Sequence, residues 1–585
     1  MKKKATWYVF WGLLYVAAAW AQTPATSDTT SGKAAPATFE SKQLPEIKLK
    51  EYTIVGLAKV TLPHKIRQQI FKNVKLRWVE NPEIMQKEPP SVSFQFSRIK
   101  PSLFELYESP WMNSGIYYGS YNTIGLDINT QFQTRRTTLY ISADWARSDG
   151  HLDNAQWRST GLRAGFHQQL AKGQIFTAGT DYDFRKQGIW GDYQKFKTDW
   201  SAQHTLWNTF ANLNQQWSKR FTTRLDGSYI FDSQKSAFHY KDQGANLKGS
   251  ASFDFNQTRI EAKATYRKSK LSVTNGNLDH LRSDSLSLRE YEGSLLNGLV
   301  LFQQQWQIFT GNIGILYQRS EENISHQWVF KENKTYTYPQ ASVAIGLSGW
   351  GSFTIGYRPG AEVFTLRDMV KSLPFSDISQ MRITNYKSRL ESSLEINVSG
   401  KLSFGLSGNI SRADNYLAPV ATADSLQAVF PPKGYPGWVY GTLDEIELRE
   451  VQTKFRWDIV KKLHVSGWLT ARNSEIQKYS NAVVIGKKVP YLPDLNFDAK
   501  IGWNFYRMHE IALMTDYVGS RYNDLQNKIK LNDYLLLNAR LGLMFTPKIE
   551  FYLEGRNLLG RKYEIWKGFQ APGLNTYAGL RMQLY

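Results

Sequence analysis

The sequence lacks several features that would each indicate a particular class of protein. There is no cysteine among the 585 residues, which excludes disulfide scaffolds, thiolate nucleophiles and cysteine-bound metals. Beyond the N-terminal leader no apolar run approaches about 20 residues, which excludes a polytopic helical membrane protein. No H-E-x-x-H, G-x-S-x-G or Walker A pattern occurs. We therefore predict that the protein is not an enzyme and needs no cofactor, and we assign no catalytic, cofactor-binding or metal-binding residue.

The first residues predict export from the cytoplasm. Three lysines at 2–4 precede an apolar stretch over 8–19, and the triplet A-W-A that ends at Ala21 matches the small-x-small cleavage rule. These features predict a signal peptide over residues 1–21, followed by a mature chain that starts at Gln22. An uncleaved anchor helix is the alternative, but the apolar stretch is short and no basic flank follows it.

The net charge is +21, and the basic residues are spread along the chain rather than gathered in a tail. An exported protein rarely meets nucleic acid, so we predict no nucleic-acid partner. We attribute the charge to a solvated basic surface or lumen near the anionic headgroups of outer-membrane lipid.

Two N-terminal segments follow the leader. Residues 22–46 are rich in Thr, Ser, Ala and Pro and have no apolar periodicity, which predicts a disordered tether. Residues 47–90 form a short segment of their own, in which 52–56 resembles a short strand. The part 63–78 fits an amphipathic helix and an alternating strand equally well, so both interpretations remain open.

From about residue 91 the chain repeats segments of roughly ten residues in which apolar and polar side chains alternate. Leu247, Ala251 and Phe253 share one face of such a segment, and Lys248 and Ser252 share the other. The same alternation resumes after a turn at 256–258, which predicts an antiparallel hairpin with one apolar and one polar face. We expect the polar face to line a hydrated lumen with Asp127, Asp144, Asp226, Asp254, Arg224, Lys263, Glu550 and Arg556.

Short and long connections alternate along this repeat. Tight turns are predicted near residues 134, 172, 219, 257, 304, 350, 400, 461, 507 and 547, and long polar loops over 186–204, 268–293, 319–337, 359–387, 413–444 and 557–575. Turns on one side and loops on the other are typical of outer-membrane barrels. With 91–99 as the first strand, we predict an all-β fold, a transmembrane antiparallel β-barrel of about 22 strands over residues 91–585. Six tryptophans near strand ends are expected to form interface girdles: Trp190, Trp200, Trp306, Trp328, Trp350 and Trp566.

The last hundred residues carry a more specific pattern. The segment 557–564 (N-L-L-G-R-K-Y-E), the loop 568–573 (G-F-Q-A-P-G) and the segment 517–522 (Y-V-G-S-R-Y) together resemble motifs of TonB-dependent receptors. The stretch 50–56 (K-E-Y-T-I-V-G) resembles the family's energy-coupling box or the start of its plug. The resemblance implies an outer-membrane receptor that works with a TonB-type energy-coupling protein. Only residues 57–90 separate 50–56 from the expected barrel, which is too short for the family's plug domain and indicates a plug-less member.

We predict that the protein is an outer-membrane transport or receptor barrel that binds or passes an unidentified small solute. The alternative is a non-transporting scaffold or adhesin that works with a separate plug or a surface lipoprotein. Because a barrel of this size leaves a wide lumen, something should restrict it: residues 47–90, an inward-folded loop such as 359–387 or 413–444, or a partner chain. We predict that 47–90 acts as a partial stopper, with its basic residues next to lumen carboxylates such as Asp127 and Asp226.

Overall fold

The computed structural model describes residues 112–584 except 135, 172, 189–200, 236–237, 276–289, 326–328, 348–349, 365, 367–376, 379–380, 400, 422–437, 461 and 507–508. The predicted signal peptide, tether, short segment 47–90 and first strand at 91–99 lie outside the described residues. All described residues belong to the second of two compact units of the chain, Asn81–Tyr585. None of the described helices is long and apolar enough to span a membrane.

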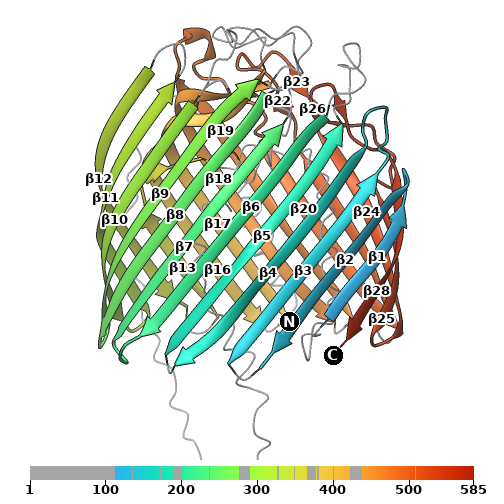
Figure 1. Cartoon of the computed structure of the whole chain (residues 1–585), viewed down its shortest axis with the longest axis horizontal. Coiled ribbons are helices and arrows are strands. Elements are labelled where there is room, and N and C mark those ends of the chain that lie inside the picture. Colours follow the sequence, from blue (N-terminus) through green and yellow to red (C-terminus); the bar gives the residue numbers. More distant parts are fainter. Residues whose placement is uncertain are drawn as a thin grey trace, which may run out of the picture. The chain divides into compact units, whose positions relative to one another are not determined.

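The described residues form one closed antiparallel barrel of 22 strands (Figure 1). Strand β1 pairs with β2 on one side and with the last strand, β28, on the other, and this second pairing closes the barrel. The predicted fold class and strand number are therefore confirmed. The barrel strands are β1 Met112–Gly119, β2 Thr123–Gln133, β3 Thr137–Ser148, β4 Trp157–Ala171, β5 Gln174–Gly188, β6 Ser201–Gln216, β7 Phe221–Lys235, β8 Phe238–Phe255, β9 Thr258–Asn275, β10 Glu290–Trp306, β11 Phe309–Ser325, β12 Val329–Gly346, β13 Gly351–Tyr357, β16 Thr384–Ser399, β17 Leu402–Ala421, β18 Trp438–Val460, β19 Leu463–Lys478, β20 Leu495–Tyr506, β21 His509–Val518, β24 Tyr534–Thr546, β25 Ile549–Arg556 and β28 Asn575–Leu584.

Shorter elements lie in the connections between these strands. They are β14 Gly360–Glu362, β15 Asp377–Ile378, β22 Arg521–Tyr522, β23 Lys530–Leu531, β26 Glu564–Trp566, β27 Phe569–Gln570 and a 3₁₀ helix, Ala482–Val484. β14 continues the pairing of β13 with β16, and β15 pairs in parallel with the start of β18.

The two faces of the wall follow the alternation read from the sequence. On β8 the side chain of Phe253 is 44% exposed and that of its neighbour Ser252 only 5%. Phe253 pairs with Ile260 of β9, which is also exposed, so both belong to an outward apolar band. An apolar outer face on a closed sheet that leaves no free edge is the arrangement by which strands cross a bilayer. The barrel is therefore a transmembrane barrel of the outer-membrane type.

The two ends of the barrel differ in their connections. All ten predicted tight turns are present at one end, which we call the turn end, and each has two to four residues. At the β8–β9 turn, Asn256 has a φ of 54°, the left-handed conformation that a two-residue hairpin requires. The other end, the loop end, carries every connection longer than four residues, with β22, β23 and β26 at the top of Figure 1, although two or three residues join β1 to β2, β7 to β8 and β11 to β12 there. In outer-membrane barrels the end with longer loops faces the exterior.

Two boundaries expected from the sequence were wrong. The first strand is β1, Met112–Gly119, and not 91–99. Because β1 is only eight residues long and a three-residue turn joins it to β2, its alternation merges with that of the next strand in the sequence. A long loop expected over 319–337 is also replaced by strand, since β11 runs to Ser325 and β12 starts at Val329. Because the first barrel strand starts at Met112, the residues between the 50–56 motif and the barrel are 57–111 and not 57–90.

Strands β8–β12 and β17–β18 have 17 to 23 residues, whereas a tilted transmembrane strand needs about 9–11. The outward face shows where the bilayer ends. Beyond Tyr266 on β9 the outward side chains are Lys268 and Lys270, which form ion pairs with Glu292 (2.5 Å) and Glu290 (2.7 Å) of β10. A row of charges cannot face hydrocarbon without a large cost, so these strands continue past the bilayer at the loop end.

Candidate functional site

The predicted lumen-facing residues lie on the inward face of the wall, where most have charged partners. Asp226 pairs with Arg224 of the same strand (2.9 Å) and accepts a hydrogen bond from Asn212. Arg556 pairs with Glu554 (2.5 Å). Two further predicted residues have similar local partners: Lys263 pairs with Glu261 (3.3 Å) and Asp254 with Arg259 (3.7 Å).

Asp127 and Asp144 differ from the other predicted carboxylates. They are direct register partners on β2 and β3, so two like charges stand opposite each other on the inner wall. Within the described residues neither forms an ion pair as short as 4 Å. Like charges in this position are unfavourable, so this part of the wall carries local negative charge.

The predicted Glu550 is the centre of a buried network near the turn end. Its side chain is buried and bridges Arg540 (2.7 Å) and Arg581 (3.4 Å), which come from the two neighbouring strands, β24 and β28. Both arginines are also largely buried, and Arg540 lies 3.9 Å from Glu510 of β21. Opposite charges on neighbouring strands thus neutralise one another on the inner face of the wall.

One connection folds against the inner wall of the barrel. It lies between β13 and β16, and we call its residues 360–364 and 366, together with 381–384, the inward segment. Gln318 on the inner face of β11 accepts a hydrogen bond from the Ala361 N–H (2.7 Å) and donates to the Ala361 carbonyl (3.3 Å). Leu295 of β10 packs with Ala361, Val363 and Ile383 in a buried apolar cluster. The loop expected at 359–387, one of the candidates for restricting the lumen, therefore has residues that fold inward.

Two buried carboxylates hold the inward segment through its backbone. Glu322 of β11 accepts hydrogen bonds from the Ile383 N–H (2.6 Å) and from Arg382 Nε (3.2 Å). Asp242 of β8 accepts from the Leu366 N–H (2.9 Å) and from the Ser269 hydroxyl (2.7 Å). Hydrogen bonds to an ionised acceptor are about twice as strong as neutral ones. The segment is therefore attached to the wall at both of its described parts.

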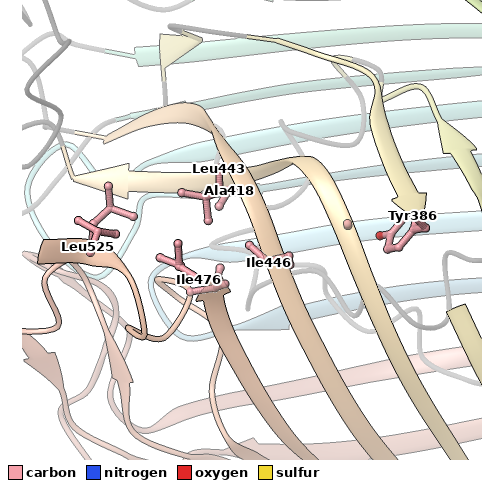
Figure 2. Close-up of a cluster of buried hydrophobic side chains, with 9 residues drawn as sticks. Tyr386, Ala418, Leu443, Ile446, Ile476 and Leu525 are labelled. Carbon is pink, nitrogen blue, oxygen red and sulfur yellow. The ribbon is translucent and has the colours of Figure 1, made fainter. Parts of the chain in front are cut away.

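The loop end also carries a folded cap, built from the connections 479–494, 519–533 and 557–574. Hydrogen bonds join the first two, from the Tyr491 N–H to the Tyr522 carbonyl (2.8 Å) and from the Lys488 N–H to the Asn527 side-chain Oδ1 (2.7 Å). Figure 2 shows Leu525 of the cap beside side chains at the ends of β17, β18 and β19. The buried cluster consists of Tyr386, Ala413, Ala418, Leu443, Ile446, Ile476, Val484, Val489 and Leu525.

Trp566 corrects one prediction, because it is fully buried in the cap rather than part of an interface girdle. Its ring lies 4.1 Å from that of Tyr491, between centroids. The buried Arg521 joins the same region by donating to the carbonyls of Glu564 (2.9 Å) and Ile565 (2.6 Å). Trp306 and Trp350, by contrast, are exposed at the turn end as expected of girdle residues. Trp190, Trp200 and Trp328 lie outside the described residues.

The motif at 557–564 has a structural explanation in this cap. Asn557 has a φ of 50°, a left-handed conformation that turns the chain sharply after β25. Its side-chain amide donates to the carbonyls of Arg561 (2.8 Å) and Pro572 (3.2 Å), and its Oδ1 accepts from the Arg561 N–H (3.0 Å). One asparagine thus fixes both the 557–561 turn and its contact with the P-G loop.

No family model matches the sequence, and no curated protein matches it. Solved structures match the fold. The siderophore receptor PiuA from Acinetobacter baumannii aligns with a TM-score of 0.61 at 11% identity, over 81% of this chain and 82% of that chain. The FrpB iron transporter from Neisseria meningitidis (F3-3 variant) aligns with a TM-score of 0.63 at 11% identity, over 82% of each chain. The ferric-catecholate import receptor Fiu from E. coli K12 aligns with a TM-score of 0.62 at 9% identity, over 82% of each chain.

This chain has the barrel fold of the TonB-dependent receptors. At identities of 9–11% the likeness concerns the fold alone. Within the receptor-type barrel, function must therefore be argued from the side chains of the lumen and the loop end.

Sequence reasoning missed the residues that hold the inward segment, above all Gln318, Glu322 and Asp242. One signal was present, because the run Arg319 to Glu322 puts charge on both faces of β11. Arg319 and Glu321 face outward and pair with each other (2.7 Å), whereas Glu322 faces inward and is buried. An inward charge that is buried needs a partner, but the sequence does not say which distant segment supplies it.

Proposed function

We propose that this protein is an outer-membrane receptor and transport barrel that takes up a small solute from the loop end. The inward segment is the observation that carries the proposal. It is attached to the lumen face of the wall through Glu322 and Asp242, on strands β11 and β8. A barrel that only anchored another protein would not need ordered chain against its own lumen face.

A residue-level test first establishes that the wall crosses a bilayer. Ile128 and Asn129 are neighbours on β2 at the same depth; Ile128 faces outward, and Asn129 faces the lumen and is exposed there. We expect Ile128→Arg to cost about 2–4 kcal/mol near the bilayer midplane, and Asn129→Arg to assemble normally. The measurement is the fraction of heat-modifiable protein in the outer-membrane fraction. Equal yields of the two variants would contradict the transmembrane wall.

The transport proposal itself is tested by uptake. Cells that express the protein at the outer membrane are compared with cells lacking it for retention of a panel of labelled small solutes. We expect at least one solute to require the protein, and we expect deletion of residues 360–383 to change its uptake while the barrel still assembles. Normal assembly with no dependence for any solute would favour the scaffold or adhesin alternative.

We also propose that residues 47–90 act as a partial stopper. Of the two carboxylates expected to receive its basic residues, Asp226 is already paired with Arg224, whereas Asp127 stands opposite Asp144. Deleting 47–90 should raise both the conductance of the barrel in planar bilayers and the sensitivity of cells to large antibiotics. An assembled barrel with neither change would contradict this proposal.

The partners proposed for this function are a TonB-type energy-coupling protein and a separate plug or surface lipoprotein. Receptors with this fold work with TonB, which supports the first of these. Purification of the intact protein from cross-linked membranes, followed by identification of the cross-linked chains, tests all three. Uptake that persists without an energised inner membrane would argue against coupling.

A further inference from the structure

Two tyrosines form a stacked aromatic surface on the lumen side of β12. The rings of Tyr336 and Tyr338 have centroids 5.9 Å apart and planes only 11° from parallel. Their register partners on β11 are Gln318 and Leu316, both on the inward face. Both rings are partly exposed, although Gln318 beside them is buried under the inward segment. The rings therefore lie at the edge of the inward segment, where a solute in the lumen would contact them.

The polar edges of this surface are unevenly occupied. The Tyr338 hydroxyl donates to Asn385 Oδ1 (2.8 Å), which fixes that ring against β16. The ring of Tyr336 stacks on that of Tyr338. Within the described part of the chain, the Tyr336 hydroxyl forms no hydrogen bond. Tyr336 thus offers a ring face together with a hydroxyl that can donate to and accept from a solute.

The cations around the two rings are held in ion pairs. Arg382 is bound by Glu322 (3.2 Å) and Glu332, and Lys334 is bound by Glu332 (2.7 Å). Lys387 is shared by Asp414 (2.7 Å) and Glu445 (3.1 Å). Each of these three cations is therefore ion-paired, and the four carboxylates outnumber them. None of these three cations is left unpaired to attract an anionic chelate.

From this arrangement we infer that Tyr336 and Tyr338 form a binding subsite for a neutral, sugar-like solute. The inference deepens the proposed transport function and rests on it. A pyranose ring has one face of C–H groups that packs on an aromatic ring and an edge of hydroxyl groups that hydrogen-bond with phenols and amides. Tyr336 has both a ring and a hydroxyl, so this one side chain can make both kinds of contact with a sugar unit. An anionic ferric chelate, by contrast, would need unpaired cations.

The test uses NMR to measure the transfer of saturation from the full-length, detergent-solubilised protein to three neutral probes: maltohexaose, cellohexaose and xylohexaose. We expect transfer to the C–H protons of the sugar rings for at least one probe. Tyr336→Ala should weaken that binding at least tenfold, and Tyr336→Phe, which keeps the ring, should weaken it only a few-fold. Thr337→Ala is the matched control, because Thr337 lies between the two tyrosines and faces outward.

Heat-modifiability of each variant shows whether the barrel has folded, which separates a folding defect from loss of the subsite. The variant Tyr336→Leu keeps apolar bulk without a ring, and it should bind the probe as weakly as Tyr336→Ala does. Absence of transfer from all three probes, or equal transfer with and without the Tyr336 ring, overturns the inference. Binding of ferric citrate that does not depend on Tyr336 also overturns it, yet leaves the transport function intact. Loss of the transport function itself shows separately in the uptake assay.

Discussion

Two parts of the inner wall bury carboxylates in different ways. On the β24–β28 side, Glu550 is neutralised by Arg540 and Arg581 from the strands next to its own. On the β8–β11 side, Glu322 and Asp242 accept backbone N–H groups from the inward segment, which is 61 and 124 residues away along the chain. The first arrangement is part of the wall, and the second attaches something to it. We therefore expect loss of Glu550 to weaken the whole barrel and loss of Glu322 to release one segment.

The largest effect is expected from Glu550→Ala. Removing the carboxylate leaves the buried Arg540 and Arg581 next to each other, and breaking a buried ion pair on one side costs about 3–5 kcal/mol. The global free energy of unfolding in lipid vesicles, measured by urea titration, should fall by about this amount. Glu290→Ala serves as the control, because its pair with Lys270 is exposed and should contribute little to stability. Equal effects would mean that the buried network is no more important than the surface pairs.

A smaller and local effect is expected from Glu322→Gln. The amide can still accept one hydrogen bond, but the charge that strengthens the bonds from Ile383 and Arg382 is lost. A charge-assisted bond contributes about 1.5–3 kcal/mol, so hydrogen exchange at residues 381–384 should accelerate by roughly 10–100-fold. The urea midpoint of the barrel should not move.

Glu321→Gln provides the matched control for that experiment, since Glu321 is the adjacent residue on β11 and faces outward. It should leave exchange at 381–384 unchanged. If Glu322→Gln instead lowers the global stability as much as Glu550→Ala does, the distinction between wall and attached segment is wrong.

The smallest effect concerns pH at the cap. His151 lies in the β3–β4 connection, and burial lowers its pKa. The hydrogen bond between its Nε2 and the Gln570 carbonyl of the cap (2.7 Å) partly opposes this lowering of the pKa. The pKa of His151 in the folded protein lies below the unfolded value of about 6.5. Protonation of His151 therefore favours local unfolding of the β3–β4 connection. The stabilisation is complete above pH 6.5 and is lost as the pH falls from there through the folded pKa.

Hydrogen exchange of residues 149–156, corrected for the intrinsic rate, should therefore be faster at pH 5.5 than at pH 7.5. The variant His151→Gln should show no such difference, because it has no titrating group in this range. A pH dependence that persists in the variant would assign the effect to another group.

Much of the barrel was predictable because a strand with one lipid face and one lumen face must alternate. Phe253 and Ser252 show the principle, and the ten tight turns followed from where the alternation stops. The errors arose where that rule gives no signal. Strand β1 is short and merges with β2, and β11 and β12 continue past the bilayer, where neither face needs to be apolar. The polar residues at these strand ends therefore looked like a loop when only the sequence was considered.

The sequence by itself determined which side chains face lipid and which face the lumen, because a period of two residues leaves no other choice once one face must be apolar. Only the tertiary structure decided which lumen residues are covered. Gln318, Glu322 and Asp242 look like any other inward polar residue, and they become buried because the inward segment folds onto them. Trp566 shows the same limit, since a tryptophan near a strand end can lie at the bilayer surface or in the core of a cap. The reason is physical: alternation is a local property of one strand, whereas burial depends on contacts between segments far apart in the chain.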